Sequence, residues 1–225
     1  MSNRHRRLAA ALCGLTLALP ALAAEAPAAD DPHAACRAKA AAAAAEAAKP
    51  EAAPAGASVT LEDLALVDQH GVSRRFASEV IADRVVVMDF IFTTCTTICP
   101  LLSSKMVRLQ EKLGDRLGKD VFLVSVSVDP LRDTPQKLLA YAGKWKARPG
   151  WTFLTGPKAD VDAVLKGVGA YTANFTDHPP MFLVGDGKAG RWTRLNGFPD
   201  ADRILQQVDE LVAARTRTAS LGGQP

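Results

Sequence analysis

The pattern of apolar and polar positions changes character near residue 58. The preceding segment, residues 25–57, is rich in alanine and proline and has no apolar side chain larger than alanine except Cys36. Such a segment cannot build a hydrophobic core. Strand-like and helix-like periods then follow one another as far as residue 214. We therefore predict a linker over 25–57, one domain over 58–214 and a flexible tail over 215–225.

Within the domain, the pattern predicts strands that alternate with helices. Two runs flank the turn at Gln69 to Gly71 and indicate a hairpin. Two later runs, Arg84 to Phe92 and Val121 to Val128, are almost wholly apolar and typical of strands buried on both faces. Helical spacing, or helix-capping residues, marks the segments that contain Leu102 to Leu113, Thr134 to Trp145 and Ile204 to Leu211, and a second hairpin joins Pro180–Val184 to Arg191–Leu195.

The order of these elements is strand, helix, strand, helix, a short linking piece, two antiparallel strands and a last helix. A strand, helix and strand in succession form a parallel pair with a right-handed crossover, to which the hairpin adds antiparallel strands. The expected fold is therefore α/β, a thioredoxin-like three-layer α/β/α sandwich with an added N-terminal β-hairpin.

The first 24 residues have the pattern of an export signal. Three arginines precede an uncharged run from Leu8 to Ala24, which ends in small residues of the kind that a signal peptidase accepts. A retained membrane anchor is the alternative, since the run is close to the shortest length that spans a bilayer. Either way we expect a periplasmic or otherwise exported domain, in an oxidising compartment where cysteines form disulfides.

Net charge excludes one class of partner. Without the three arginines of the signal, 24 basic residues balance 24 acidic ones. A nucleic-acid-binding protein needs a basic surface to neutralise phosphates, so no nucleic-acid partner is expected.

Candidate chemistry lies in the loop after the first buried strand, which contains Cys95 and Cys99 ahead of a helix. Unpaired amides and the helix dipole at this position favour a thiolate. Two thiols in one loop can close a disulfide or hold a metal. Four helical residues rise about 6 Å, which a disulfide still tolerates. Two sulfurs alone leave a metal under-coordinated, so a third ligand is needed.

Only one of the four histidines is well placed to be that ligand. His5 lies in the signal, His33 in the linker and His70 in a turn, whereas His178 directly precedes the second hairpin. Two thiolates and an imidazole suit copper, Cu(I) above all. The pair formed by His33 and Cys36 cannot close a site by itself, although an odd exported thiol such as Cys36 sometimes pairs between molecules.

Several other residues near these positions have ordinary interpretations. Asp129 is a turn residue or an outer-sphere group of the site, and Asp133 with Thr134 is interpreted as a helix cap. Asp177 either orients the His178 imidazole or caps its own loop. A cis bond at Pro179-Pro180 would change the direction of the imidazole.

These motifs resemble the Sco/SenC family of copper-binding proteins. The matching pieces are Asp89 to Phe90 with Thr94 to Pro100, Ser127 to Pro130, Arg132 to Pro135, Trp151 to Gly156 and Asp177-His178. The resemblance implies a thioredoxin-like fold and ligation of one copper ion, Cu(I) or Cu(II), by Cys95, Cys99 and His178. It also implies that the partner is the copper-centre subunit of cytochrome c oxidase or another periplasmic copper protein.

Two functions remain open at this point. The first is a non-enzymatic copper chaperone that delivers its ion to the dinuclear copper centre of cytochrome c oxidase, and that an oxidised Cys95–Cys99 disulfide switches off. The alternative is a thiol–disulfide oxidoreductase that reduces the cysteines of that copper centre, with Cys95 attacking, Cys99 resolving and a thiol reductant as partner. A peroxidase is a third idea, but no proline or arginine pattern upstream of Cys95 favours it.

Overall fold

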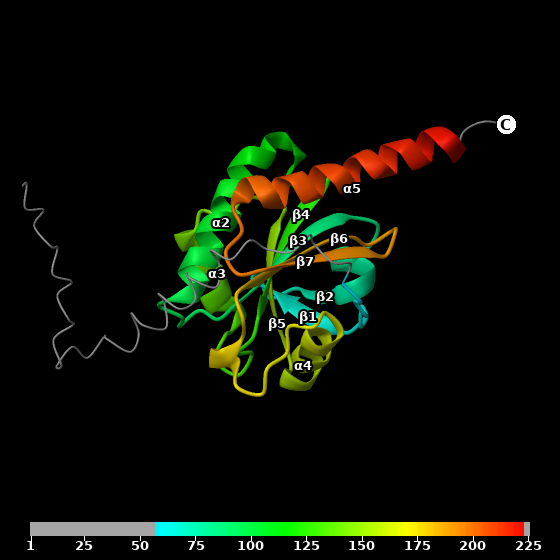
Figure 1. Cartoon of the computed structure of the whole chain (residues 1–225). Coiled ribbons are helices and arrows are strands. Elements are labelled where there is room, and N and C mark those ends of the chain that lie inside the picture. Colours follow the sequence, from blue (N-terminus) through cyan, green and yellow to red (C-terminus); the bar gives the residue numbers. More distant parts are fainter. Residues whose placement is uncertain (1–56, 223–225) are drawn as a thin grey trace, which may run out of the picture.

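A seven-stranded mixed sheet forms the centre of the molecule (Figure 1). The computed structural model describes residues 57–222, so the predicted signal, nearly all of the linker, His33 and Cys36 lie outside the described residues. The strand order is β2-β1-β5-β4-β3-β6-β7. The strands are β1 (Ala65–Asp68), β2 (Ser73–Arg75), β3 (Val85–Ile91), β4 (Val121–Ser127), β5 (Trp151–Thr155), β6 (Met181–Asp186) and β7 (Arg191–Asn196).

Pairing in the sheet follows the predicted topology. Strands β3, β4 and β5 are parallel, and both hairpins, β1–β2 and β6–β7, pair antiparallel. The first hairpin joins the sheet through β5 and the second joins it through β3. The three parallel strands therefore end at one edge of the sheet, where ligands bind in open α/β folds.

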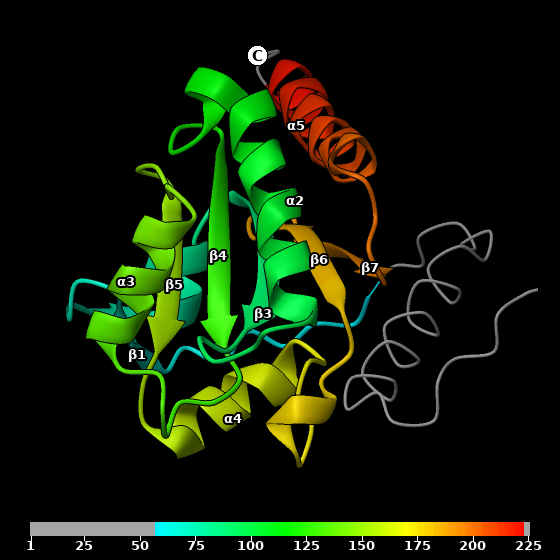
Figure 2. The ribbon, with the colours of Figure 1, turned by 90° about the vertical axis from the view of Figure 1, so that its left-hand side faces the viewer.

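Helices cover both faces, which confirms the three layers (Figure 2). One face packs against α2 (Ile98–Leu113), α3 (Pro135–Lys144) and α5 (Ala201–Gly222). The other packs against the helical turn η1 (Phe76–Ile81) and α4 (Lys158–Gly167). Within residues 57–222, no helix combines the length and the apolar character that crossing a bilayer requires.

Strand β3 lies at the centre and contributes to both cores. Val87 and Ile91 pack on the side of α2, whereas Met88 and Phe90 pack on the opposite side. Because side chains alternate along a strand, Asp89 falls on the side of α2, in the interior. A buried strand of this kind holds the residues that follow it in a fixed position.

Two expectations need correction. The short linking piece contains a strand, β5, and a helix, α4. The buried residues of α4, which are Val161, Val164 and Leu165, have helical spacing. The tail expected from residue 215 is helical as far as Gly222, because α5 continues and Arg215 bonds to the carboxylate of Asp186 at 2.6 and 2.7 Å.

Candidate metal and thiol site

Two loops meet at the carboxyl edge of the parallel strands. The first joins β3 to α2 and contains Cys95, and the second contains the turn η3 (Phe175–Asp177) and His178. In Figure 2 both lie at the lower end of the molecule, beside the start of α2. The Phe92 ring at the start of the first loop contacts the His178 ring edge-on, with centroids 5.9 Å apart. The topology thus brings together segments 83 residues apart in the sequence.

Both cysteines are free thiols, but their surroundings differ. Cys95 is half-buried, whereas Cys99 is fully buried in the first turn of α2. The amide of Cys99 donates a hydrogen bond to the Cys95 sulfur at 3.2 Å. Sequence position alone did not distinguish the two thiols.

This geometry gives the two thiols opposite acidities. A hydrogen bond from the Cys99 thiol, helped by the amides of Cys99, Thr97 and Ile98, lowers the pKa of Cys95 to about 5 against the effect of burial. The same contact with Cys95, together with burial, raises the pKa of Cys99. At neutral pH Cys95 is therefore a thiolate, the form that attacks disulfides and binds metals.

Hydrogen bonds fix the loop around Cys95. The amide of Cys95 donates to the Phe92 carbonyl at 3.1 Å. The hydroxyl of Thr93 donates to the Asp133 carboxylate at 2.6 Å, and the Thr93 amide lies 3.2 Å from both carboxylate oxygens. The interpretation of Asp133 as a helix cap is therefore wrong. The cap of α3 is the Thr134 side chain, which accepts from the Lys137 amide.

The His178 imidazole faces inward. The residue is only 3% exposed, and its Nε2 lies 3.0 Å from the Phe90 carbonyl. A carbonyl can only accept, so Nε2 carries the proton of the neutral ring. Nδ1 is then the unprotonated nitrogen, and it is buried with no hydrogen-bond partner among the described residues. Burial lowers the pKa of His178, which keeps the ring neutral near pH 7.

The structure brings the three predicted ligands to one edge of the sheet without assembling them. Among residues 57–222, no group of three or more Cys, His, Asp or Glu side chains is close enough together to hold a metal ion. The two sulfurs of Cys95 and Cys99 are the donors already in contact. A third bond from His178 would come from its unprotonated Nδ1, while Nε2 keeps its bond to the Phe90 carbonyl, and it requires the two loops to move closer together.

The expected outer-sphere groups have other roles. Asp177 is exposed and accepts hydrogen bonds from Asn174 and Thr176 in its own turn, so the Phe90 carbonyl orients the imidazole in its place. Asp129 is buried and pairs with Arg132 at 3.1 Å. All peptide bonds among the described residues are trans, including those at Pro179-Pro180.

Sequence reasoning did not identify Asp89 as a residue of interest beyond its place in a motif. It is fully buried, its Oδ1 accepts from the Ser125 hydroxyl at 2.5 Å, and Oδ2 has no partner among the described residues. Burial raises the pKa of Asp89 to about 7, and its charge in turn raises the pKa of Cys99. The feature of the sequence that could have identified Asp89 is its position as a lone acidic residue in an apolar strand.

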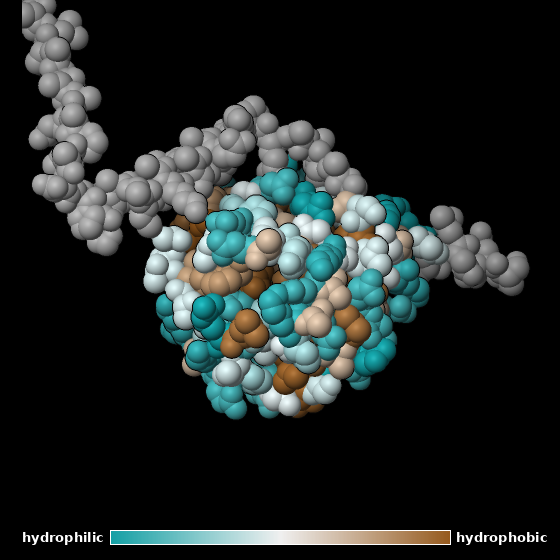
Figure 3. Space-filling model, turned by 90° about the horizontal axis from the view of Figure 1, so that it is seen from below, coloured by the Kyte–Doolittle hydropathy of each residue, from teal (hydrophilic) through white to brown (hydrophobic). Residues whose placement is uncertain are grey.

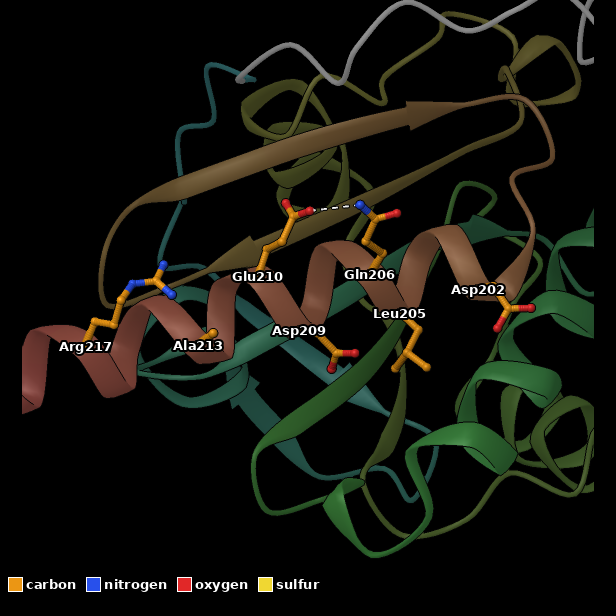
Figure 4. Close-up of a pocket in the computed structure, with 7 residues that line it drawn as sticks. All are labelled: Asp202, Leu205, Gln206, Asp209, Glu210, Ala213 and Arg217. Atoms are coloured by element: carbon orange, nitrogen blue, oxygen red, sulfur yellow. Dashed lines mark hydrogen bonds between the residues drawn. The ribbon is translucent and has the colours of Figure 1, made fainter.

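On the face that contains this edge, apolar and polar residues of the described chain are interspersed. Figure 3, a view from below, shows brown residues separated by teal ones. The exposed large apolar side chains include Leu101, which follows Cys99 in α2, and Leu131, in the loop after β4; they are 52% and 73% exposed. A separate open groove follows α5 and is lined only by its own side chains (Figure 4). Two of its acidic residues, Asp202 and Asp209, pair with basic residues of α2 and of the helical turn η2 (Gly114–Arg116).

Comparison with known proteins agrees with these features. The model of the SCO1/SenC family matches residues 52–213. A relative from Stutzerimonas stutzeri described as "Putative copper-binding protein" is 35% identical over 48% of this chain and 52% of its own length. The SCO1 protein homolog of Bacillus subtilis is 37% identical over 43% of this chain and 49% of its own. The matched part thus spans about half the length of these curated relatives.

A solved structure is similar over a larger part of the chain. BsSco, a member of the Sco family of cytochrome c oxidase assembly proteins in which a disulfide switch has been identified, is 27% identical. The similarity covers 72% of this chain and 98% of that one, with a TM-score of 0.60.

Proposed function

Because the chain belongs to the SCO1/SenC family, we propose that it is an exported copper chaperone. It binds one copper ion as cargo through Cys95, Cys99 and His178 and delivers it to a copper protein. The observation that carries the proposal is the Cys95 thiolate, held 3.2 Å from the Cys99 amide at the start of α2. The described thiol donors and the nearby imidazole are a soft, low-coordinate set that suits Cu(I).

Copper would bind in three steps. Cys95 is ionised at neutral pH, so it offers the first bond without losing a proton. Copper then has to displace the proton of Cys99, whose pKa is raised. His178 joins last, through its unprotonated Nδ1, because the described structure does not hold this ring together with the two sulfurs. A ligand that is held apart from the other two also provides a route for release, since its departure leaves the ion on two sulfurs.

The destination is proposed from the family. BsSco belongs to a family of cytochrome c oxidase assembly proteins. By extension, the recipient here is the copper-centre subunit of that oxidase. The N-terminal signal pattern favours export to the periplasm, either with cleavage or with the segment kept as an anchor.

The asymmetry of the cysteines favours a second candidate, reduction of the recipient's disulfide. The half-exposed Cys95 thiolate would attack one sulfur of that disulfide and release the other as a thiolate. Cys99 would then lose its proton and attack the mixed bond at Cys95, which frees the recipient's dithiol and leaves a Cys95–Cys99 disulfide. A thiol reductant would restore the pair. In this function His178 has no required role.

Copper retention separates the two functions. We would load the reduced full chain with Cu(I), remove loose metal by gel filtration and measure copper per chain. The wild type is expected to keep one copper, and His178→Ala to bind it roughly 100-fold more weakly, at least as large a loss as that of an outer-sphere partner. His70→Ala is the matched control, because His70 is an exposed turn residue.

Two outcomes would contradict the chaperone. Failure of the wild type to retain copper would remove it outright, and equal affinity in His178→Ala would remove the three-ligand site. A Cys36→Ser variant keeps the linker thiol from supplying a false site. Unfolding by urea, measured in each variant, shows whether a loss of copper reflects a loss of fold.

A further inference from the structure

We propose that Asp133 is a positioning residue, which fixes the loop of Cys95 to the ends of β4 and β5 and thereby sets the thiol–disulfide balance of the cysteine pair. The inference deepens the proposed function by naming what controls that site. Asp133 lies between β4 and α3. Within the described structure it makes no hydrogen bond to either cysteine.

The carboxylate of Asp133 receives hydrogen bonds from two elements. Its Oδ1 accepts from the Thr93 hydroxyl at 2.6 Å, and its Oδ2 accepts from the Ser127 hydroxyl at 2.6 Å. The Thr93 amide donates between the two oxygens, at 3.2 Å from each. Thr93 belongs to the cysteine loop and Ser127 ends β4, so one side chain joins the two.

The backbone of Asp133 connects β5 to the same point. Its carbonyl accepts from the Thr155 hydroxyl, at the end of β5, at 2.8 Å. Its amide donates to the Asp129 carbonyl at 2.9 Å, which closes the turn after β4. The residue is only 1% exposed. Segments 22 and 40 residues away from Asp133 are therefore held together at one buried point.

This arrangement requires a carboxylate. Each side-chain oxygen faces a hydroxyl donor, and the shared amide is a donor as well. Asparagine has one acceptor oxygen and an NH₂ group that only donates, so it must oppose at least one of these donors. The Ser127 hydroxyl also accepts from the Asp129 amide at 3.1 Å, which fixes the direction of its proton toward Asp133.

The position of Thr93 matters for Cys95 because only one residue separates them. The Cys95 sulfur accepts a hydrogen bond from the Cys99 amide at 3.2 Å, at the start of α2. This donor stabilises the reduced sulfur only if the loop keeps the sulfur within reach, and held donors are more effective than donors that must reorganise. A looser loop therefore weakens this hydrogen bond and, with it, the reduced form of the pair.

The direct test is the equilibrium with glutathione, in which the protein disulfide and two reduced glutathiones give the protein dithiol and one glutathione disulfide. We expect Asp133→Asn to shift this equilibrium about tenfold toward the protein disulfide, which is about 30 mV for a two-electron couple. The matched control is Asp129→Asn. It makes the same change at a buried carboxylate in the same loop, whose partner is Arg132. Its equilibrium should stay within about twofold of the wild type.

A second pair of variants tests the contact from its other side and covers the case in which Asp133→Asn fails to fold. Thr93→Val removes the hydroxyl and should shift the equilibrium in the same direction, whereas Thr93→Ser keeps the hydroxyl and should restore the wild-type value. Equal equilibria in Asp133→Asn and wild type would overturn the proposal, as would an equal shift in Asp129→Asn. If Asp133→Asn does not fold, a wild-type equilibrium in Thr93→Val would overturn it.

The outcome does not depend on copper. A wild-type protein that fails to hold copper would contradict the chaperone function, yet the glutathione equilibrium would still measure the role of Asp133. Conversely, a normal equilibrium in Asp133→Asn would leave the copper site untouched.

Discussion

The loop of Cys95 is tied to its neighbours through Thr93 and Asp133, whereas the imidazole of His178 is held by one hydrogen bond to the Phe90 carbonyl. Both loops lie at the same edge of the sheet, and both contain an expected ligand. In the first, the buried contacts keep the reactive atom in its charged, accessible form. In the second, they keep the ring neutral, buried and turned toward the strand.

This difference indicates a site that is only half assembled in the described structure. The two sulfurs are in place, whereas the third donor, the His178 imidazole, lies nearby with its ring turned inward. This arrangement is unfavourable in free energy, because the unprotonated Nδ1 of His178 is buried without a described partner and has lost its hydrogen bonds to water. A bond from Nδ1 to copper would compensate for that loss. The predictions below test each half of the comparison.

The largest expected effect concerns the two thiols. At pH 6, Cys95 is mostly ionised because its pKa is about 5, whereas the raised pKa and burial of Cys99 keep it inert. In the reduced wild type, alkylation by iodoacetamide should therefore be at least about 100-fold faster at Cys95 than at Cys99. Mass spectrometry of the reduced protein over time measures both rates.

A smaller change is expected in the alkylation rate of Cys95 itself. Cys99→Ser replaces the thiol that lowers the pKa of Cys95 most, so Cys95 should react more slowly at pH 6 than in the wild type. The amides of Thr97 and Ile98 remain to stabilise it. Equal rates at Cys95 and Cys99 in the wild type would mean that the two thiols are equivalent, and would contradict the conclusion that the contacts of its loop keep Cys95 in its charged form.

The next effect concerns the buried carboxyl beneath the cysteine loop. Burial raises the pKa of Asp89 to about 7, so between about pH 4 and 7 the folded state holds a proton that the unfolded state has lost. This group therefore makes the wild type less stable as the pH rises through that window, by at most about 4 kcal/mol. Asp89→Asn removes the loss, and it should gain stability relative to the wild type between pH 4.5 and 7.5 in urea unfolding of the reduced proteins.

Asp186→Asn is a matched control with the opposite sign. Burial opposes ionisation of Asp186 as well, but the hydrogen bonds from Arg215 and from the amides of Ala189 and Lys188, together with the charge of Arg215, outweigh it and lower its pKa. Its asparagine variant should therefore lose stability relative to the wild type as the pH rises. A gap between Asp89→Asn and wild type that does not change with pH would show that Asp89 is not protonated in the folded protein.

The meeting of the two loops was predictable from the sequence. Apolar runs before Cys95 and after His178 indicated two strands, and the expected thioredoxin-like fold places the loop before the second beside the end of the first. The structure pairs these strands, β3 and β6, antiparallel, so the amino end of β6 lies beside the carboxyl end of β3. The strand β5 was overlooked because its five residues, bounded by Gly150 and Gly156, were interpreted as part of a link. The alternation of its buried Trp151 and Phe153 was the available signal.

The orientation of side chains within the site was not predictable, because the decisive partners are distant in sequence. Asp133 was interpreted through its neighbour Thr134, yet it bonds to Thr93, which is 40 residues away. Asp177 was given two possible roles, to orient the His178 imidazole or to cap its own loop; it bonds within its own turn, and the imidazole bonds to a carbonyl 88 residues away. Local patterns identify caps and turns, whereas such contacts depend on how strands and helices pack.

The smallest expected effect concerns the contacts that hold the His178 imidazole. The Phe92 ring packs edge-on against Phe175 and His178, with centroids 5.0 and 5.9 Å away. Phe92→Leu removes both contacts and should cost about 1–2 kcal/mol of stability. Because burial is what lowers the pKa of His178, a looser loop should move that pKa up toward its ordinary value, as measured by NMR titration of the imidazole. Phe175→Leu, which leaves the direct contact with His178 in place, should move it less. An unchanged pKa in Phe92→Leu would mean that this ring does not help to hold the imidazole, and that the Phe90 carbonyl and the strand alone keep it in place.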